Sequence, residues 1–319
     1  MVGGVEVGLP KPYHLLLSRD GAVVLPCLPH LRSDQEAVEF FNRCFAAMLL
    51  GGVYCESIGL DGLDFGSIID WKYIRVHTSA PAAANRFHHL VRLRQASPLE
   101  AIALHGPPSA CVADLRAAMD AGRAILEALP ELSGEFLLKG VTGIARRDWG
   151  AALANLWIVV EQITSHMWAL HVMAPAKATD PITGRVDQLA DPRTWTIAVR
   201  HELLHQIGVL PRETLAKLSD ARKARNALAH QGKHPAATAA QAAYAAVIEL
   251  LEVAVPGHPI PLLALDLGDH SLSDPFIPRE PATVDPTHWM EIPKLPGEAE
   301  LERLEAKDRV GRRTGEKSH

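Results

Sequence analysis

Apolar residues in the middle of the chain recur three and four residues apart, which is the spacing of one face of an α-helix. Two such stripes are continuous. The first comprises Val112, Leu115, Met119, Gly122, Leu126 and Leu129, and the second comprises Leu153, Leu156, Val160, Ile163 and Met167. A helix with one apolar stripe must bury it against another element, so these segments are expected to pack together.

Three further helices are predicted downstream, at residues 194–206, 211–231 and from Pro235 to Pro256. Pro211 stands where the second of these can begin, and Gly232 follows its expected end. The composition agrees, because aromatic residues make up only 5% of the chain and its apolar content leans on Ala, Leu and Val. The predicted fold class is therefore mainly α, with an antiparallel helical bundle.

The first 110 residues carry mixed signals. Ser33 followed by Glu36 is a capping box that should begin a helix, and Gly51 with Gly52 should end it. Short apolar runs bounded by turn residues predict strands at residues 13–17, 22–25, 53–58 and 71–77. We therefore expect a mixed α+β region before the helical bundle.

Prolines divide the chain into three parts. Pro107-Pro108 favours a boundary between a region at 1–110 and a helical domain at 111–255. Proline then recurs nine times from Pro256 to Pro296, which predicts an extended and partly disordered arm at 256–319. Within that arm, residues 298–313 are rich in charge and are expected to form a short exposed helix.

Charge, cysteine content and hydropathy exclude several classes of protein. The net charge is −5, so any contact with nucleic acid must come from a local basic patch. The four cysteines are widely separated, which favours reduced thiols over disulfides or a cysteine-rich zinc site. No secretory leader opens the chain and no apolar run reaches the roughly 18 residues of a membrane span. We expect a cytoplasmic protein that does not enter a membrane.

One candidate site is the sequence His201-Glu202-Leu203-Leu204-His205. Histidines four residues apart share a helical face and can both bind zinc, while the glutamate can act as a general base. The five residues resemble the signature of zinc-dependent metallopeptidases, but a third ligand is needed, and Pro211 stands where one such pattern places a histidine. A zinc hydrolase using His201, His205 and Glu202 is thus an alternative, and no cofactor is expected otherwise.

A second candidate site is Arg225-Asn226 followed by His230, near the end of a predicted helix. Together with its surroundings, this segment resembles HEPN domains, small all-helical modules whose signature is Arg, a polar residue that is usually Asn, a few residues and His. The resemblance extends over residues 112–255 and includes a long helix with Glu161 in its middle. It implies a metal-independent endoribonuclease, a homodimer whose two motifs meet in one cleft, and a role in bacterial defence or as a toxin.

The residue types suit cleavage of RNA by its own 2′-hydroxyl. Histidine is a common general acid and base, so His230 can move protons, and Arg225 offers a planar, charged fork for phosphate oxygens. Asn226 can orient either group. Glu161 is expected to pair with Arg225 and position its guanidinium, or else to face solvent. Arg225 and His230 project about 140° apart on an ideal helix, which suits a frayed helix end or a cleft shared by two subunits.

Basic residues surround this motif. Between residues 212 and 233 there are six Lys and Arg residues against two Asp and Glu residues, which predicts a local patch for RNA. Arg222, Lys223 and Lys233 are the predicted RNA-binding residues. In the structural alternative, Arg225 pairs with a neighbouring acid and His230 stabilises the end of its helix.

The assembly is expected to be a homodimer in which the helices at 212–231 face each other. Trp157, Glu161, Thr164 and Trp168 form a second stripe that one core does not easily cover, so it either lies at the dimer interface or packs under the N-terminal region. A noncatalytic dimer that binds RNA or a regulatory protein is a further alternative.

Overall fold

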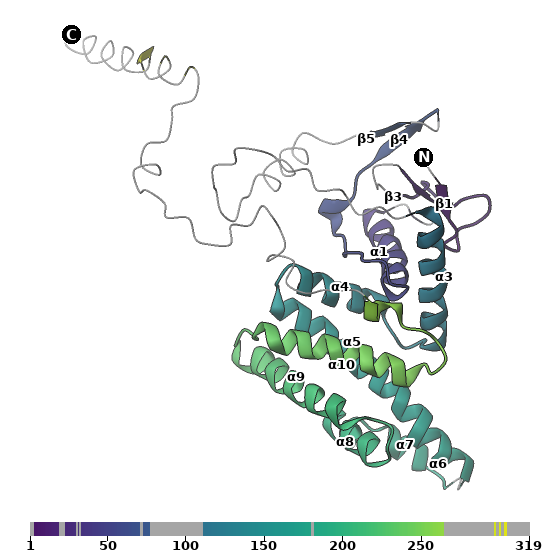
Figure 1. The fold of residues 1–319 in the computed structure, drawn as a ribbon, viewed down its shortest axis with the longest axis vertical. Coiled ribbons are helices and arrows are strands. Elements are labelled where there is room, and N and C mark those ends of the chain that lie inside the picture. The colour runs from purple at the N-terminus through teal and green to yellow at the C-terminus, as the bar shows by residue number, and fades with distance from the viewer. Residues whose placement is uncertain are drawn as a thin grey trace, which may run out of the picture. The chain divides into compact units, whose positions relative to one another are not determined.

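The structure, a computed structural model, describes residues 3–18, 23–29, 31, 33–70, 73–76, 111–179 and 182–264, together with residues 297, 300, 303 and 304. All described residues up to Ala264 fall in one compact unit. This unit is mainly helical, as predicted (Figure 1). The Pro107-Pro108 boundary, most of the arm at 256–319 and most of the helix expected at 298–313 lie outside the described residues, and the three-part division stays a prediction.

Helix α5 (Trp149–Trp168) is the centre of the bundle. It packs against α4 (Gly134–Ala145), α8 (Ile197–Gln206), α9 (Arg212–Gln231) and α10 (Ala237–Ala254). Helices α9 and α10 also pack on each other and run antiparallel (Figure 1). The predicted helices at 194–206, 211–231 and 235–256 are therefore confirmed, within a few residues at each end.

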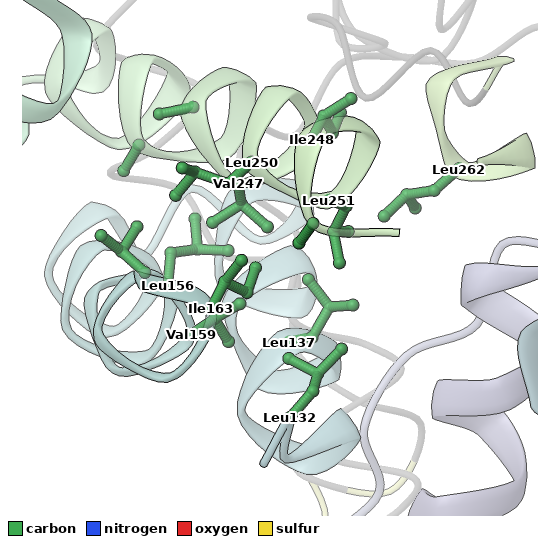
Figure 2. Packing of buried hydrophobic residues seen from close by; sticks show 14 of the residues in the cluster. Leu132, Leu137, Leu156, Val159, Ile163, Val247, Ile248, Leu250, Leu251 and Leu262 are labelled. Atoms are coloured by element: carbon green, nitrogen blue, oxygen red, sulfur yellow. The ribbon is translucent and has the colours of Figure 1, made fainter. Parts of the chain in front are cut away.

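The apolar stripe of α5 is fully buried, because α4 and α10 turn their own apolar faces toward it. Figure 2 shows this contact among Leu137, Leu156, Val159, Ile163, Val247, Leu250 and Leu251. Two glycines allow α4 to approach closely: a Cβ at Gly140 would lie 2.6 Å from Leu156, and one at Gly143 would lie 2.7 Å from the Ala152 backbone. Close packing of this kind contributes most of the stability of a helical bundle.

The apolar composition of helix α10 fits two kinds of helix, a membrane span and the core helix of a bundle. Among the described helices it is the one long and apolar enough to cross a membrane. Its buried residues pack against α5 in the core cluster, and core helices of bundles pass the same test of length and hydropathy. Its apolar character is therefore explained by its place in the bundle.

A second core lies around α1 (Asp34–Leu50) and α3 (Val112–Ala128). Helix α1 begins at the predicted capping box, where the Ser33 hydroxyl accepts from the Glu36 amide and the Glu36 carboxylate accepts from the Ser33 amide. The two helices cross at glycines: a Cβ at Gly122 would lie 1.8 Å from the Ala47 carbonyl oxygen. Contact between the two backbones thus requires glycine at this crossing.

A small antiparallel sheet covers α1 and α3. It is formed by β1 (Gly3–Val5), β2 (Leu15–Leu17) and β3 (Val23–Val24), in that order. The predicted pair at 13–17 and 22–25 corresponds to β2 and β3. The side chains of Val5, Leu15 and Leu17 enter the core shared with α1 and α3.

The strand predicted at 53–58 is wrong, because this segment is irregular in the structure. Its backbone bonds to side chains instead, with the amide of Ile58 donating to Asn42 and the amide of Ser57 donating to Thr142. The strand predicted at 71–77 is confirmed as β5 (Tyr73–Val76). It pairs in antiparallel register with β4 (Gly66–Ile69), a strand that was not predicted.

Short helical segments complete the described chain. They are η1 (Leu60–Gly62), η2 (Ala169–Met173, a π-helical turn), α6 (Ala174–Thr179), α7 (Arg185–Ala190) and η3 (Pro261–Ala264). The turns from η2 to α7 connect the end of α5 to α8, so that α8 returns along the bundle.

Candidate active site

Helix α9 carries the Arg-Asn motif and the histidine that follows it. It begins after Pro211 and ends before Gly232, whose φ of 64° is left-handed and suits glycine. Two carbonyls in its last turns accept from backbone amides beyond its end: that of Leu228 from Gly232 and that of Ala227 from Lys233. The His230 side chain forms no hydrogen bond to these carbonyls among the described residues.

The two faces of α9 place Arg225 and His230 in different surroundings. Thr214, Leu218 and Ala221 are buried against the bundle. At about 100° per residue, Arg225 lies about 20° from Leu218 and therefore on the edge of this buried face, whereas His230 lies about 120° away. The structure agrees, because Arg225 is half-buried and His230 is exposed.

Helix α9 is regular through His230 and Gln231, so its end is not frayed as one expectation required. The separation of about 140° between Arg225 and His230 therefore persists within one chain. The two side chains thus project from different faces of one α9.

Among the described residues, Arg225 has no acidic partner, unlike in the alternative interpretation, whereas His230 lies in the last turn of α9, as that interpretation requires. The Arg225 guanidinium makes one long hydrogen bond, 3.4 Å to the side-chain oxygen of Asn226, and no ion pair. His230 has no hydrogen bond or ion pair within this part of the chain, and neither does the exposed side chain of Lys233. Both motif side chains thus remain available for a ligand.

Glu161 does not pair with Arg225, contrary to the expectation. Its carboxylate accepts a 2.6 Å hydrogen bond from the indole nitrogen of Trp157, one turn earlier on α5. The half-buried carboxylate is therefore stabilised by its own helix. Glu161 is a structural residue in this arrangement, and the positioning of Arg225 has no contribution from it.

The second stripe of α5 is covered within the chain, which corrects the argument that it needs a partner or the N-terminal region. Trp157, Thr164 and Trp168 are at most 2% exposed. Thr164 bonds to His201 of α8 at 2.9 Å, and the Trp168 indole donates to the Leu189 carbonyl at 2.9 Å. Helices α7 and α8 with the segment between them thus form the missing cover.

The geometry of His201 and His205 does not suit zinc. His201 is 3% exposed and its Nε2 is bonded to Thr164, while the Nδ1 of His205 lies 2.8 Å from the Leu210 carbonyl oxygen. Glu202 accepts from Gln206. In the parts of the chain that the structure describes, no three His, Cys, Asp or Glu side chains are grouped closely enough to hold a metal ion.

A cleft of about 340 Å³ lies between α8 and α9. It is lined by Ala198, His201, Glu202, Arg212, Leu215, Ala216, Ser219 and Arg222. Burial, and then the positive charge of Arg222, lower the pKa of His201 to about 4, so its imidazole is neutral at neutral pH. Arg222 was predicted as an RNA-binding residue, but Arg212 and Ser219 were not, because only the packing of α8 on α9 makes them part of one cleft.

The predicted basic patch is only partly unpaired. Lys223 forms an ion pair with Asp220 at 3.3 Å, and both side chains are 71% exposed. Such exposed pairs contribute little, so Lys223 can exchange its partner for a phosphate. Arg212 and Arg222 have no hydrogen bond or ion pair among the described residues.

Comparison of the chain with known protein families, with curated proteins and with solved structures finds no match. The function of the site must therefore be inferred from its own residues.

Proposed function

We propose that the chain is a metal-independent endoribonuclease of the HEPN type. The observation that supports this most directly is the freedom of the motif on α9: Arg225 has no acidic partner, His230 is exposed, and the helix end is bonded by the backbone of Gly232 and Lys233. A role in bacterial defence or as a toxin follows from the family resemblance.

The proposed reaction is an internal transesterification. The ribose 2′-oxygen forms a bond to phosphorus while the bond from phosphorus to the 5′-oxygen breaks, which leaves a 2′,3′-cyclic phosphate and a 5′-hydroxyl. His230 accepts the proton of the 2′-hydroxyl, and Arg225 stabilises the charge that grows on the phosphate oxygens. The protonated His230 then gives this proton to the leaving 5′-oxygen, so that one His230 serves each site.

The dimer is needed because Arg225 and His230 project from different faces of one α9. If two copies of α9 face each other across a twofold axis, the Arg225 of one chain and the His230 of the other can reach the same phosphate. Asn226, which is exposed between them in sequence, would contact the phosphate or the other chain.

The experiment is an RNA cleavage assay with excess EDTA. We expect cleavage to survive the chelator and to fall at least about 100-fold in Arg225→Ala and His230→Ala, the usual size of a lost acid–base or charge-stabilising group. Arg193→Ala and His258→Ala remove exposed residues of the same types elsewhere and should retain activity. Activity that EDTA abolishes, or that survives His230→Ala, would contradict the proposal.

A second candidate function is a noncatalytic module that binds RNA or a regulatory protein as a dimer. The separation of Arg225 and His230 on α9 favours it, because one chain alone does not present them together. It predicts RNA binding that survives His230→Ala, without cleavage of any RNA by the wild-type protein.

A further inference from the structure

The cleft between α8 and α9 is lined by charged residues that do not belong to the motif at Arg225, Asn226 and His230. Arg212 and Arg222 both line it, and the Glu202 carboxylate lies on its α8 side. Ten residues separate the two arginines, which is about 15 Å along the helix axis. The two arginines therefore start from opposite ends of the α9 wall of the cleft.

The side chains between these ends are suited to a polar ligand with an apolar part. Ser219 offers a hydroxyl, while Ala198, Leu215 and Ala216 offer apolar surface. His201 is 3% exposed and packs edge-on against Trp157, with ring centroids 6.3 Å apart, so it forms a rigid part of the wall. The volume of about 340 Å³ is within the range of small-molecule sites.

The cleft lies on the same face of α9 as the end of the motif. Residues 219, 222, 226 and 230 are three to four positions apart and so form one stripe on the helix. The rise from Arg222 to His230 is about 12 Å. A chain of nucleotides lying along α9 would thus pass from the cleft to His230 within two or three phosphates (Figure 1 shows α8 and α9 side by side).

We propose that the cleft between α8 and α9 holds one nucleotide unit of a single-stranded RNA, with Arg222 on a phosphate beside it, Arg212 on a phosphate one or two units farther along the strand, and Glu202 accepting a hydrogen bond from the ribose 2′-hydroxyl. This inference rests on the proposed function for its substrate class, but it concerns binding and not cleavage. Arginine suits phosphate because its fork donates two hydrogen bonds, and a carboxylate distinguishes ribose from deoxyribose.

The test is the affinity of full-length protein carrying His230→Ala, which prevents cleavage, for a fluorescein-labelled 12-nucleotide uridine oligomer. We expect Arg212→Gln and Arg222→Gln each to weaken binding about tenfold, since each removes a charge-assisted contact. Each should also reduce the slope of log affinity against log salt by about 0.7, the value for one phosphate on a single strand. Arg193→Gln, an exposed arginine outside the cleft, is the matched control and should leave both values unchanged.

The ribose contact is tested with the deoxy oligomer of matched sequence. The parent protein should prefer RNA, and Glu202→Ala should reduce the ratio of RNA to DNA affinity to near one. Unchanged affinity and salt slope in both arginine variants, or equal affinity of the parent for RNA and DNA, would overturn the assignment.

The results distinguish an error in the proposed RNA site from an error in the proposed ribonuclease activity. Cleavage by the wild-type protein with no effect of the arginine variants on binding rejects the cleft alone. Weaker binding in the arginine variants, with no cleavage by the wild-type protein, rejects the nuclease and retains the RNA site.

Discussion

His201 shows how one residue that looks like a metal ligand in the sequence becomes part of a core. Its imidazole bonds to Thr164, packs against Trp157 and lines the cleft beside Arg222. A zinc ligand was an alternative hypothesis for this residue, because the spacing to His205 is that of a helical pair. What decides between the two is the direction of the side chain, which depends on the packing of α8 against α5.

Stability should depend on pH through His201. Burial and the charge of Arg222 place the pKa at about 4 in the folded protein, against 6.5 ordinarily. The unfolded chain therefore binds this proton more readily, so stability is lost as the pH falls from about 6.5 to about 4, by up to about 3 kcal/mol. Urea unfolding across this range measures the effect. His201→Met should be less stable at neutral pH but have a shallower pH dependence; an unchanged dependence would contradict this assignment.

At the scale of elements, the long helices were predictable because their apolar stripes have the helical period and their ends carry Pro, Gly or a capping box. Helix α4 has no such mark, because Gly140 and Gly143 interrupt its pattern to allow contact with α5. The strand at 53–58 was predicted from its apolar residues, but the buried Asn42 bonds to both the amide and the carbonyl of Ile58 and holds the segment in an irregular form.

The crossing of α1 and α3 should be sensitive to a single methyl group. Gly122→Ala would place a Cβ 1.8 Å from the Ala47 carbonyl oxygen, so the helices must separate. We expect a loss of about 1–3 kcal/mol in the free energy of unfolding, as for other overpacked cores.

Gly150→Ala is the matched control for this prediction, because its Cβ would meet no atom closer than 3.6 Å. Alanine there should be neutral or stabilising by up to about 1 kcal/mol, since it favours the helix. Urea denaturation of both variants measures the difference, and equal stability of the two would show that the crossing is not tight.

At the scale of the whole molecule, the candidate site was predictable in its residues but not in its geometry. The sequence identified Arg225, Asn226 and His230 as candidates. The rotation of about 100° per residue in an α-helix also predicts the angle of about 140° between Arg225 and His230. It did not predict that α7 and α8 cover Trp157 and Trp168, because the segment before α8 has no apolar period. The argument for a dimer therefore depends on the different faces of α9 that carry Arg225 and His230. The stripe of α5 that contains Trp157 and Trp168 no longer supports it.

The protein should be a dimer in solution at micromolar concentration. The reason is that Arg225 and His230 project about 140° apart while α9 stays regular through Gln231, and a twofold pair of α9 helices would bring one of each to the same phosphate. Light scattering coupled to size-exclusion chromatography measures the mass, with 34.6 kDa expected for one chain. A strict monomer that cleaves RNA would require another partner for His230 within the chain.

The central claim is a site composed of Arg225 from one chain and His230 from another, and mixing two inactive variants tests it most directly. Arg225→Ala and His230→Ala proteins, unfolded together and refolded at equal concentrations in EDTA, should form mixed dimers that each retain one intact site. Random pairing makes half of the dimers mixed, so the account predicts about a quarter of the wild-type cleavage rate. No recovery of cleavage, from mixed dimers whose formation is verified by differential tags, would contradict it.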